Sequence, residues 1–184
     1  MDDYKPNPPK TIPVSLEGRT TGILVLDLTI RCHDPNEICS KLMAPLGEFL
    51  ERARAFQPTI VYTASATAKG TPQGEVAQPL KRRPTEPLIN PDGFDKFTGG
   101  ELQTILNQGG VRELVVLGSS TNVAVLYTAT TAARIHRYPV IVPVDGVNTK
   151  RPYEHEYSLH QLSILPGDVG KRFRFTTLSM IQFT

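Results

Sequence analysis

The sequence predicts one α/β domain with a doubly wound, mainly parallel, six-stranded sheet and helices on both faces, a Rossmann-like architecture. Two observations predict it. Short continuous apolar runs, typical of strands buried on both faces, alternate along the chain with segments of helical periodicity. The length of 184 residues suits one domain with a full core and would be cramped for two. Such alternation gives parallel strands joined by crossover helices.

The chain begins with a Pro-rich segment, 1–19, which we expect to be an arm that wraps the surface or reaches a neighbouring subunit, while 20–184 form the domain. The first predicted strand is the apolar run 23–28. A helix is predicted over 35–56, and a second buried strand at 59–63. The helix is predicted from apolar residues at helical spacing, which are Ile38, Leu42, Leu46, Phe49, Leu50 and Ala53.

The middle of the chain is polar before it becomes regular again. The segment 64–87 contains several Gly and Pro residues and is too long for a simple turn, so we expect it to be functional. A short strand at 87–89 and a turn at 91–93 follow. The next helix stops at the glycine pair 109–110, a C-cap signal. Its apolar residues are Leu102, Ile105 and Leu106.

The second half repeats the alternation. Strands are predicted at 113–117, 140–144 and 173–178, with helices over 121–136 and 153–164 between them. In a doubly wound sheet of this kind the first strand lies beside the fourth, and ligands bind there, at the carboxyl ends of the strands.

Topology therefore brings two polar features to one crevice. Asp27 lies near the end of the first strand, and Gly118 ends the fourth. A buried carboxylate costs several kcal/mol unless it is paired or protonated. We therefore interpret Asp27 as functional, the alternative being an aspartate that braces a loop by accepting backbone N–H bonds.

The turn 118–124 joins an apolar strand to a helix rich in Ala and Val. Such a junction presents backbone N–H groups at a helix N-terminus, where they could bind an oxyanion or a carboxylate. A tight connection that needs only a glycine and an N-cap is the alternative. Ala124 stands where the junction could carry a nucleophile, and it has no reactive atom. The candidate binding residues are Ser119, Ser120, Thr121, Asn122, Val123 and Ala124.

Composition argues against several classes of function. The net charge is only +2 and the charges are dispersed, so no nucleic-acid partner is expected; the cluster 81–83 is interpreted as a solvated loop. No stretch has the length of a membrane-spanning helix. We expect a protein of the reducing cytoplasm that does not interact with membranes.

Cysteine and histidine give no site by themselves. Cys32 could be a displaced thiol nucleophile, but no His or Lys is placed to activate it, so a packing role is favoured. Cys39 is interpreted as packing or surface, and a disulfide scaffold is not needed at this size. The four histidines lack the spacing of a metal site, so no metal and no cofactor are predicted.

Several motifs, in this order, resemble the isochorismatase-like hydrolases, a family that includes nicotinamidases and N-carbamoylsarcosine amidohydrolases. The resemblance covers about 21–178 and rests on four segments, which are 24–27, 94–102, 115–133 and 138–145, with the helix from Glu154 continuing it. The family's amidases use an aspartate, a lysine and a cysteine. The cysteine attacks the carbonyl, the aspartate moves its proton, the lysine tunes both, and main-chain N–H groups beside the cysteine hold the oxyanion.

The resemblance places this triad on the chain, in degenerate form. The aspartate is Asp27 and the cysteine position falls on Ala124. The lysine usually stands about six residues before the aromatic at Phe97, which means Pro91 or, with one inserted residue, Asn90. Neither Pro91 nor Asn90 can supply an ammonium, and Ala124 cannot supply a thiol.

One branch of the family, isochorismatase itself, lacks the cysteine and hydrolyses a vinyl ether by protonation from the aspartate, but it keeps the lysine. Lys69 or Lys96 could lean in from the loops here, although Lys96, next to Asp95, is favoured as a solvated charge. The zinc-binding Asp and His residues of nicotinamidases have no match in 64–72.

We therefore predict a hydrolase of a small molecule with a non-covalent, Asp27-dependent mechanism, not a cysteine amidase. Burial without a cation would raise the pKa of Asp27 as acid–base work requires, and Asn90 or Asn122 would orient the substrate with the turn N–H groups. The alternatives are a catalytically inactive relative that binds a small molecule and a structural subunit. The resemblance implies a homo-oligomer, a dimer or tetramer.

Overall fold

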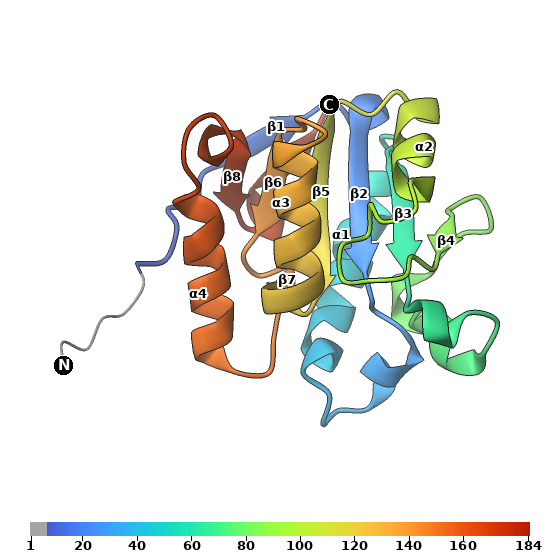
Figure 1. The fold of residues 1–184 in the computed structure, drawn as a ribbon. Helices are drawn as coiled ribbons and strands as arrows, with labels where there is room; N and C mark the ends of the chain where they lie inside the picture. Colours follow the sequence, from blue (N-terminus) through green and yellow to red (C-terminus); the bar gives the residue numbers. More distant parts are fainter. Residues whose placement is uncertain (1–6) are drawn as a thin grey trace.

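Seven parallel strands form the central sheet of the computed structural model, which describes residues 7–184 (Figure 1). The strands are β2 (Thr21–Leu26), β3 (Thr59–Thr63), β4 (Leu88–Ile89), β5 (Glu113–Ser119), β6 (Val140–Pro143), β7 (Val147–Asn148) and β8 (Phe173–Thr176). Their order is β4-β3-β2-β5-β6-β8, and β7 pairs with β5. The predicted fold class is confirmed, with β7 as the additional strand.

The predicted neighbours at the centre of the sheet are also confirmed, since β2 lies between β3 and β5. Leu26, the last residue of β2, pairs with Thr63 on one side and with Gly118 on the other. All six residues of β2 are buried, as the continuous apolar run predicts for a strand covered on both faces. Residues that follow these three strands therefore share one edge of the sheet.

Within residues 7–184, four α-helices cover the two faces of the sheet (Figure 1). They are α1 (Met43–Arg54), α2 (Glu101–Gln108), α3 (Leu126–Arg134) and α4 (Pro152–Ser163). The buried residues of α2, α3 and α4 pack with Leu24 and Leu26 of β2, whereas those of α1 pack with Ile23 and Val25. Alternation along the strand thus divides the core into two layers. Among the described residues, no helix is long and apolar enough to cross a membrane.

Two short strands form a second, separate parallel pair. β1 (Val14–Leu16) lies within the segment expected to be an arm, and β9 (Ile181–Phe183) is an element that the sequence did not predict. Leu16 is completely buried against the α1 layer, so this part of the segment belongs to the core. The first six residues of the expected arm lie outside the described part of the chain.

The helices predicted over 35–56 and 121–136 begin differently from expectation. The first is preceded by two 3₁₀ turns, Ile30–His33 and Ile38–Leu42, and becomes α-helical only at Met43. The second begins as a π-helical turn, Thr121–Val125, before α3. In both places tertiary contacts after a sheet strand override the helical periodicity of the sequence.

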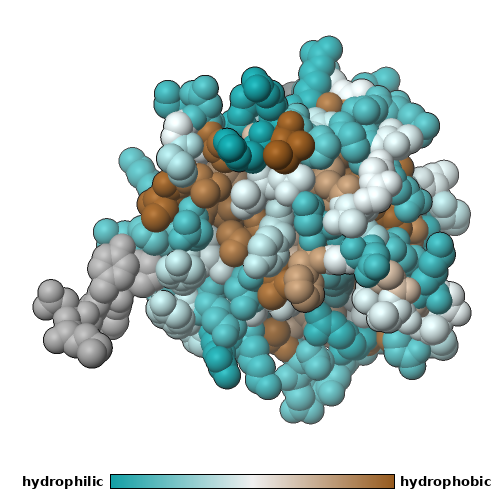
Figure 2. Space-filling view, in the orientation of Figure 1, coloured by the Kyte–Doolittle hydropathy of each residue, from teal (hydrophilic) through white to brown (hydrophobic). Residues whose placement is uncertain are grey.

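On the face that α2, α3 and α4 cover, hydrophobic residues lie in patches interrupted by hydrophilic ones (Figure 2). The exposed aromatic residues include two stacked pairs, Phe94 with Tyr127 and Tyr153 with Tyr157. The Phe94–Tyr127 pair lies at the start of α3.

Gly118 allows the close approach of β5 to β2, and its replacement should destabilise the fold. Its φ is +131°, and a Cβ there would lie against the Leu26 carbonyl oxygen. We expect Gly118→Ala to lower the free energy of unfolding by roughly 3 kcal/mol or to prevent folding, because both strain and backbone overlap oppose it. Urea denaturation measures this change.

Gly99→Ala is the matched control. Gly99 also has a positive φ, +83°, but a Cβ there would meet nothing within 4 Å. It should cost only the strain of that conformation, about 1 kcal/mol. If Gly118→Ala and Gly99→Ala lost the same free energy of unfolding, the close contact between β5 and β2 at Gly118 would not be the cause of the loss.

Candidate functional site

Asp27 follows β2 directly and is held by the end of β3. Its backbone N–H donates to the carbonyl oxygen and to Oγ1 of Thr63, both at 3.2 Å, and Thr63 Oγ1 donates to Asp27 Oδ1 at 2.8 Å. Its φ is +56°, a left-handed conformation that aspartate adopts more readily than most residues. The side chain is 26% exposed, so Asp27 stands at the sheet edge rather than inside the strand.

Lys96 supplies the cation of the site. Its Nζ lies 2.8 Å from Asp27 Oδ2 and 3.4 Å from the Gly93 carbonyl oxygen, and its side chain is only 3% exposed. A buried ammonium is stable only when it is paired, and Asp27 is its partner. The interpretation of Lys96 as a solvated charge is therefore wrong. The expectation of a carboxylate without a cation is wrong for the same reason.

Main-chain contacts with α3 bring Lys96 inward. The Lys96 N–H donates to Thr128 Oγ1 at 3.1 Å, and Thr128 Oγ1 in turn donates to the Phe94 carbonyl oxygen at 3.4 Å. Thr128 is fully buried and stands four residues after Ala124, one helical turn along. Ala124 therefore faces the same side of the helix as the contact that holds the lysine segment.

The motif positions assigned to the lysine do not approach Asp27 in this way. The Asn90 Nδ2 donates to the carbonyl oxygens of Ala64 and Ser65, at 3.3 and 3.4 Å, and so ties β4 to the loop after β3. Lys69, the other lysine considered, is exposed. The prediction that the site lacks an ammonium is corrected by Lys96, five to six residues further along the chain. The long lysine side chain makes such a displacement possible.

The turn after β5 presents main chain at the same edge. The Ser120 carbonyl oxygen accepts hydrogen bonds from the N–H groups of Val123 and Val125, both at 3.2 Å, so the Val123 N–H is engaged within the turn. The N–H groups of Thr121 and Asn122 precede the first intrahelical bond. The peptide bond between Ser119 and Ser120 is cis.

The polar side chains of this turn bind the start of α4. Thr121 Oγ1 lies 3.0 Å from His155 Nδ1. Asn122 Oδ1 accepts from Thr149 Oγ1 at 2.8 Å, and Asn122 Nδ2 donates to Glu154 Oε2 at 3.3 Å. These contacts engage both ends of the Asn122 amide, so the main chain of the turn and the Ser119 side chain are the parts that can meet a ligand.

Ser119 is a turn residue whose buried side chain is unengaged. Its Oγ is buried and has no hydrogen-bond partner among the described residues. Its neighbour across β5 and β7 is Asn148, whose Nδ2 donates to the Ile38 carbonyl oxygen at 2.8 Å and whose Oδ1 is also buried and unpartnered within residues 7–184. A buried polar group left unpaired costs about 1–3 kcal/mol, so both atoms are candidates to bind a ligand.

Burial affects the pKa values of two histidines near the site. Burial lowers the pKa of His155, and Glu156 opposes this only partly. Burial likewise lowers the pKa of His136, partly opposed by Asp95, and the His136 ring stacks on Phe97 with centroids 4.3 Å apart. Both shifts favour the neutral form of the imidazole.

The two cysteines form a disulfide, Cys32–Cys39, in the loop that follows Asp27. Both are buried, at 1% and 0% exposure. The interpretation of both residues as unpaired is wrong, and no thiol remains at Cys32 to act as a displaced nucleophile. Proximity in sequence alone could not distinguish this pair from two packed thiols.

Metal ligands do not converge in the part of the chain that the structure describes: it contains no group of three or more His, Cys, Asp or Glu residues able to hold an ion. Asp145, which follows β6, holds the start of the 3₁₀ turn Leu178–Met180, since its Oδ1 accepts the Leu178 N–H at 2.8 Å.

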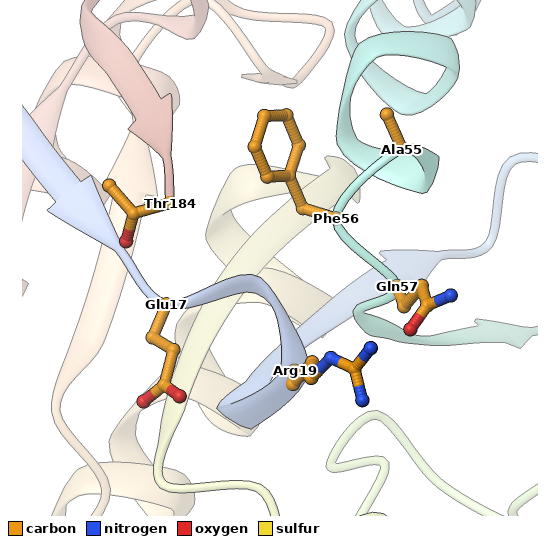
Figure 3. A pocket seen from close by; sticks show the side chains of 6 residues that line it. All are labelled: Glu17, Arg19, Ala55, Phe56, Gln57 and Thr184. Carbon is orange, nitrogen blue, oxygen red and sulfur yellow. The ribbon is translucent and has the colours of Figure 1, made fainter.

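A surface pocket lies at the opposite edge of the sheet (Figure 3). Its residues precede β2 and β3 or end the chain, whereas Asp27 follows β2. They are Glu17, Arg19, Ala55, Phe56, Gln57 and Thr184. None of the predicted site residues lines it, so this pocket and the Asp27 site are separate.

Solved structures with the same fold are hydrolases of several kinds. An isochorismatase-like hydrolase from Alkaliphilus metalliredigens is 24% identical, with a TM-score of 0.75 over 87% of this chain and 95% of that one. The nicotinamidase of Staphylococcus aureus is 19% identical, with a TM-score of 0.71 over 86% and 97%. The MAR1 ribonuclease of Caenorhabditis elegans is 16% identical, with a TM-score of 0.71 over 90% and 81%. At these identities the likeness concerns the fold.

No curated protein matches the chain. The family model of the isochorismatase domain, however, matches residues 21–172, from the start of β2 to just before β8. That span contains Asp27, Lys96 and the turn at Ala124. The chain therefore belongs to the isochorismatase family.

Proposed function

We propose that this chain hydrolyses a small molecule without a covalent enzyme intermediate, with Asp27 as the general acid–base and Lys96 as its cationic partner. The observation that supports it most is the ion pair between Lys96 Nζ and Asp27 Oδ2, at 2.8 Å. This pair stands at the carboxyl ends of the central strands, where ligands bind in doubly wound folds. Ala124 supplies no nucleophilic atom, which leaves attack to water.

Hydrolysis by this mechanism requires that Asp27 transfer the same proton twice. The Asp27 carboxylate takes a proton from a water molecule, and the water oxygen forms a bond to the electrophilic carbon of the substrate. When the bond from that carbon to the leaving group breaks, Asp27 returns the proton to the leaving atom and is again a carboxylate. Lys96 keeps the carboxylate in place through both transfers and contributes positive charge to the site.

The turn after β5 supplies the remaining groups of the proposed site. The N–H groups of Thr121 and Asn122 would stabilise negative charge that develops on a substrate oxygen. The unpartnered Ser119 hydroxyl would bind a polar group of the substrate. Asn90, between the loop after β3 and the end of β4, would border the substrate on the other side.

A catalytically inactive relative that binds a small molecule, or serves as a structural protein, is the alternative that Ala124 favours. The Asp27–Lys96 pair supports catalysis, because it keeps two of the three groups that the family's amidases use. We further propose a cytoplasmic homo-oligomer, a dimer or tetramer, without a nucleic-acid or membrane partner. Burial of the Cys32–Cys39 disulfide is compatible with the cytoplasm, since thiol–disulfide exchange needs access to a sulfur atom.

The proposal predicts turnover that does not need a thiol. A panel of small amides, esters and vinyl ethers would be tested with the wild type before and after iodoacetamide treatment, in water enriched in ¹⁸O. We expect unchanged rates, ¹⁸O in the product and no substrate adduct on the intact protein by mass spectrometry, because water attacks directly.

Ala124→Cys is the control: mass spectrometry of this variant shows whether iodoacetamide reaches a thiol at a position that is 2% exposed in the wild type. Loss of wild-type activity on alkylation, or a substrate adduct on the protein, would contradict the non-covalent mechanism. Tight binding of panel compounds with no turnover of any of them would instead support the inactive relative.

A further inference from the structure

The Asp95 carboxylate joins the lysine segment to α3. Its Oδ2 accepts a hydrogen bond from Thr131 Oγ1 at 2.6 Å, and its Oδ1 accepts one from the Phe97 N–H at 3.0 Å. Both oxygens are therefore engaged, one by the helix and one by the segment itself. The carboxylate thus fixes the main chain on both sides of Lys96.

This clamp acts together with two other contacts of the same segment. The Lys96 N–H donates to Thr128 Oγ1, one turn before Thr131 on α3. The Phe97 ring is buried and stacks on His136, just after the end of α3. The direction in which the Lys96 side chain leaves the main chain is therefore set by α3, the helix that follows Ala124.

A lysine has a flexible four-carbon stem with many rotamers, so its ammonium stays at one point only if its main chain is held. The segment 93–97 has the turns and glycine of a loop rather than a regular element. Without a clamp, the ammonium could leave Asp27 for solvent, where hydration of the charge is favourable.

We propose that Asp95 is a positioning residue that places Lys96 in the site. Lys96 there takes the lysine role that the family's motif assigns to a position five to six residues earlier. The inference rests on the proposed function, in which the Asp27–Lys96 pair does the chemistry. Asp95 acts through Lys96 and does not touch the substrate. Its removal should lower kcat more than it raises KM, since the charge that it places acts on the reaction step.

Two effects of removing Asp95 have opposite signs at the site. Loss of a negative charge, with Lys96 still in place, would make position 124 more positive and lower the pKa of a thiol there. Loss of the lysine ammonium would raise the pKa of that thiol. The direction of the change therefore distinguishes positioning from a direct effect of the Asp95 charge.

A thiol introduced by Ala124→Cys reports on this without any substrate. Because Ala124 is only 2% exposed, ionisation of this thiol is followed by the ultraviolet absorbance of the thiolate, which needs no reagent to reach it, from pH 5 to 10 in the full chain with the native disulfide intact. In that background, Lys96→Met should raise the apparent pKa of the thiol and lower the thiolate fraction at pH 7 about tenfold for each unit of pKa. Asp95→Ala should shift the profile in the same direction. Burial lowers the pKa of His136 and of His155, so the part of the profile above pH 7 is used for the comparison.

Matched variants separate the clamp from charge and folding. Asp92→Ala removes an exposed carboxylate from the same loop and should leave the profile where it is. Thr131→Val removes the hydrogen-bond donor but keeps the Asp95 charge, and should also raise the pKa; it serves if Asp95→Ala does not fold. Thermal melts by circular dichroism establish that each variant is folded.

A lowered or unchanged thiol pKa in both the Asp95→Ala and Thr131→Val variants would overturn the positioning role while leaving the Lys96 effect intact. An unchanged pKa in Lys96→Met would overturn both the positioning role and the Asp27–Lys96 site of the proposed function. A raised pKa in all three variants supports the inference.

Discussion

Asp27→Asn should lower kcat/KM of the identified substrate by about 10³-fold, because an asparagine cannot accept and return a proton. The change is nearly isosteric. The carboxamide oxygen can still accept the hydrogen bond that Thr63 Oγ1 makes to Oδ1. The position beside Thr63 should therefore be kept while the proton transfer is lost. Initial rates on the panel substrate measure the effect.

Thermal unfolding of the same variant separates chemistry from folding. Asp27→Asn leaves the Lys96 ammonium without its anionic partner, so some loss of stability is expected, but the protein should be folded at the assay temperature. A folded Asp27→Asn variant with wild-type turnover would contradict the assigned role of Asp27.

Lys96→Met should lower kcat about 10²-fold or more, with a smaller change in KM, because it removes the positive charge beside the acid–base group. Methionine fills most of the same buried volume, so the loss is chiefly one of charge. Lys96→Arg should not restore activity, since a planar guanidinium does not fit the space around a side chain that is 3% exposed. Steady-state kinetics of the three proteins test both statements.

Lys69→Met is the matched control for this prediction. Lys69 is the other lysine that the sequence suggested for the site, and it is exposed. We expect this variant to have wild-type kcat. A lower kcat in Lys69→Met together with an unchanged kcat in Lys96→Met would contradict the assignment of Lys96 as the lysine of the site.

Most of the fold could be predicted from the sequence because its strands are buried on both faces. β2 and β5 each contain four consecutive buried apolar residues, 23–26 and 114–117, and such short runs are typical of parallel strands covered on both faces. β1, β7 and β9 were not predicted, because strands of two or three residues show little periodicity, although β4, of two residues, was predicted.

The candidate site could be predicted only where topology determines it. Asp27 and the turn at Ala124 follow neighbouring strands, so their place at one edge follows from strand order. Lys96 could not be found in this way, because it lies in a loop whose path depends on contacts of Asp95 and Thr128 with α3. The signal in the sequence is its place directly before Phe97, an aromatic residue of the core.

A double-mutant cycle tests the central claim, that Asp27 and Lys96 act as one catalytic unit with water as the nucleophile. The values of kcat are measured for the wild type, Asp27→Asn, Lys96→Met and the double variant on one substrate. We predict that kcat of the double variant is at most about threefold lower than kcat of Asp27→Asn alone, because residues of one unit have strongly non-additive effects. Multiplicative losses, in which Lys96→Met slows Asp27→Asn as much as it slows the wild type, would contradict the account.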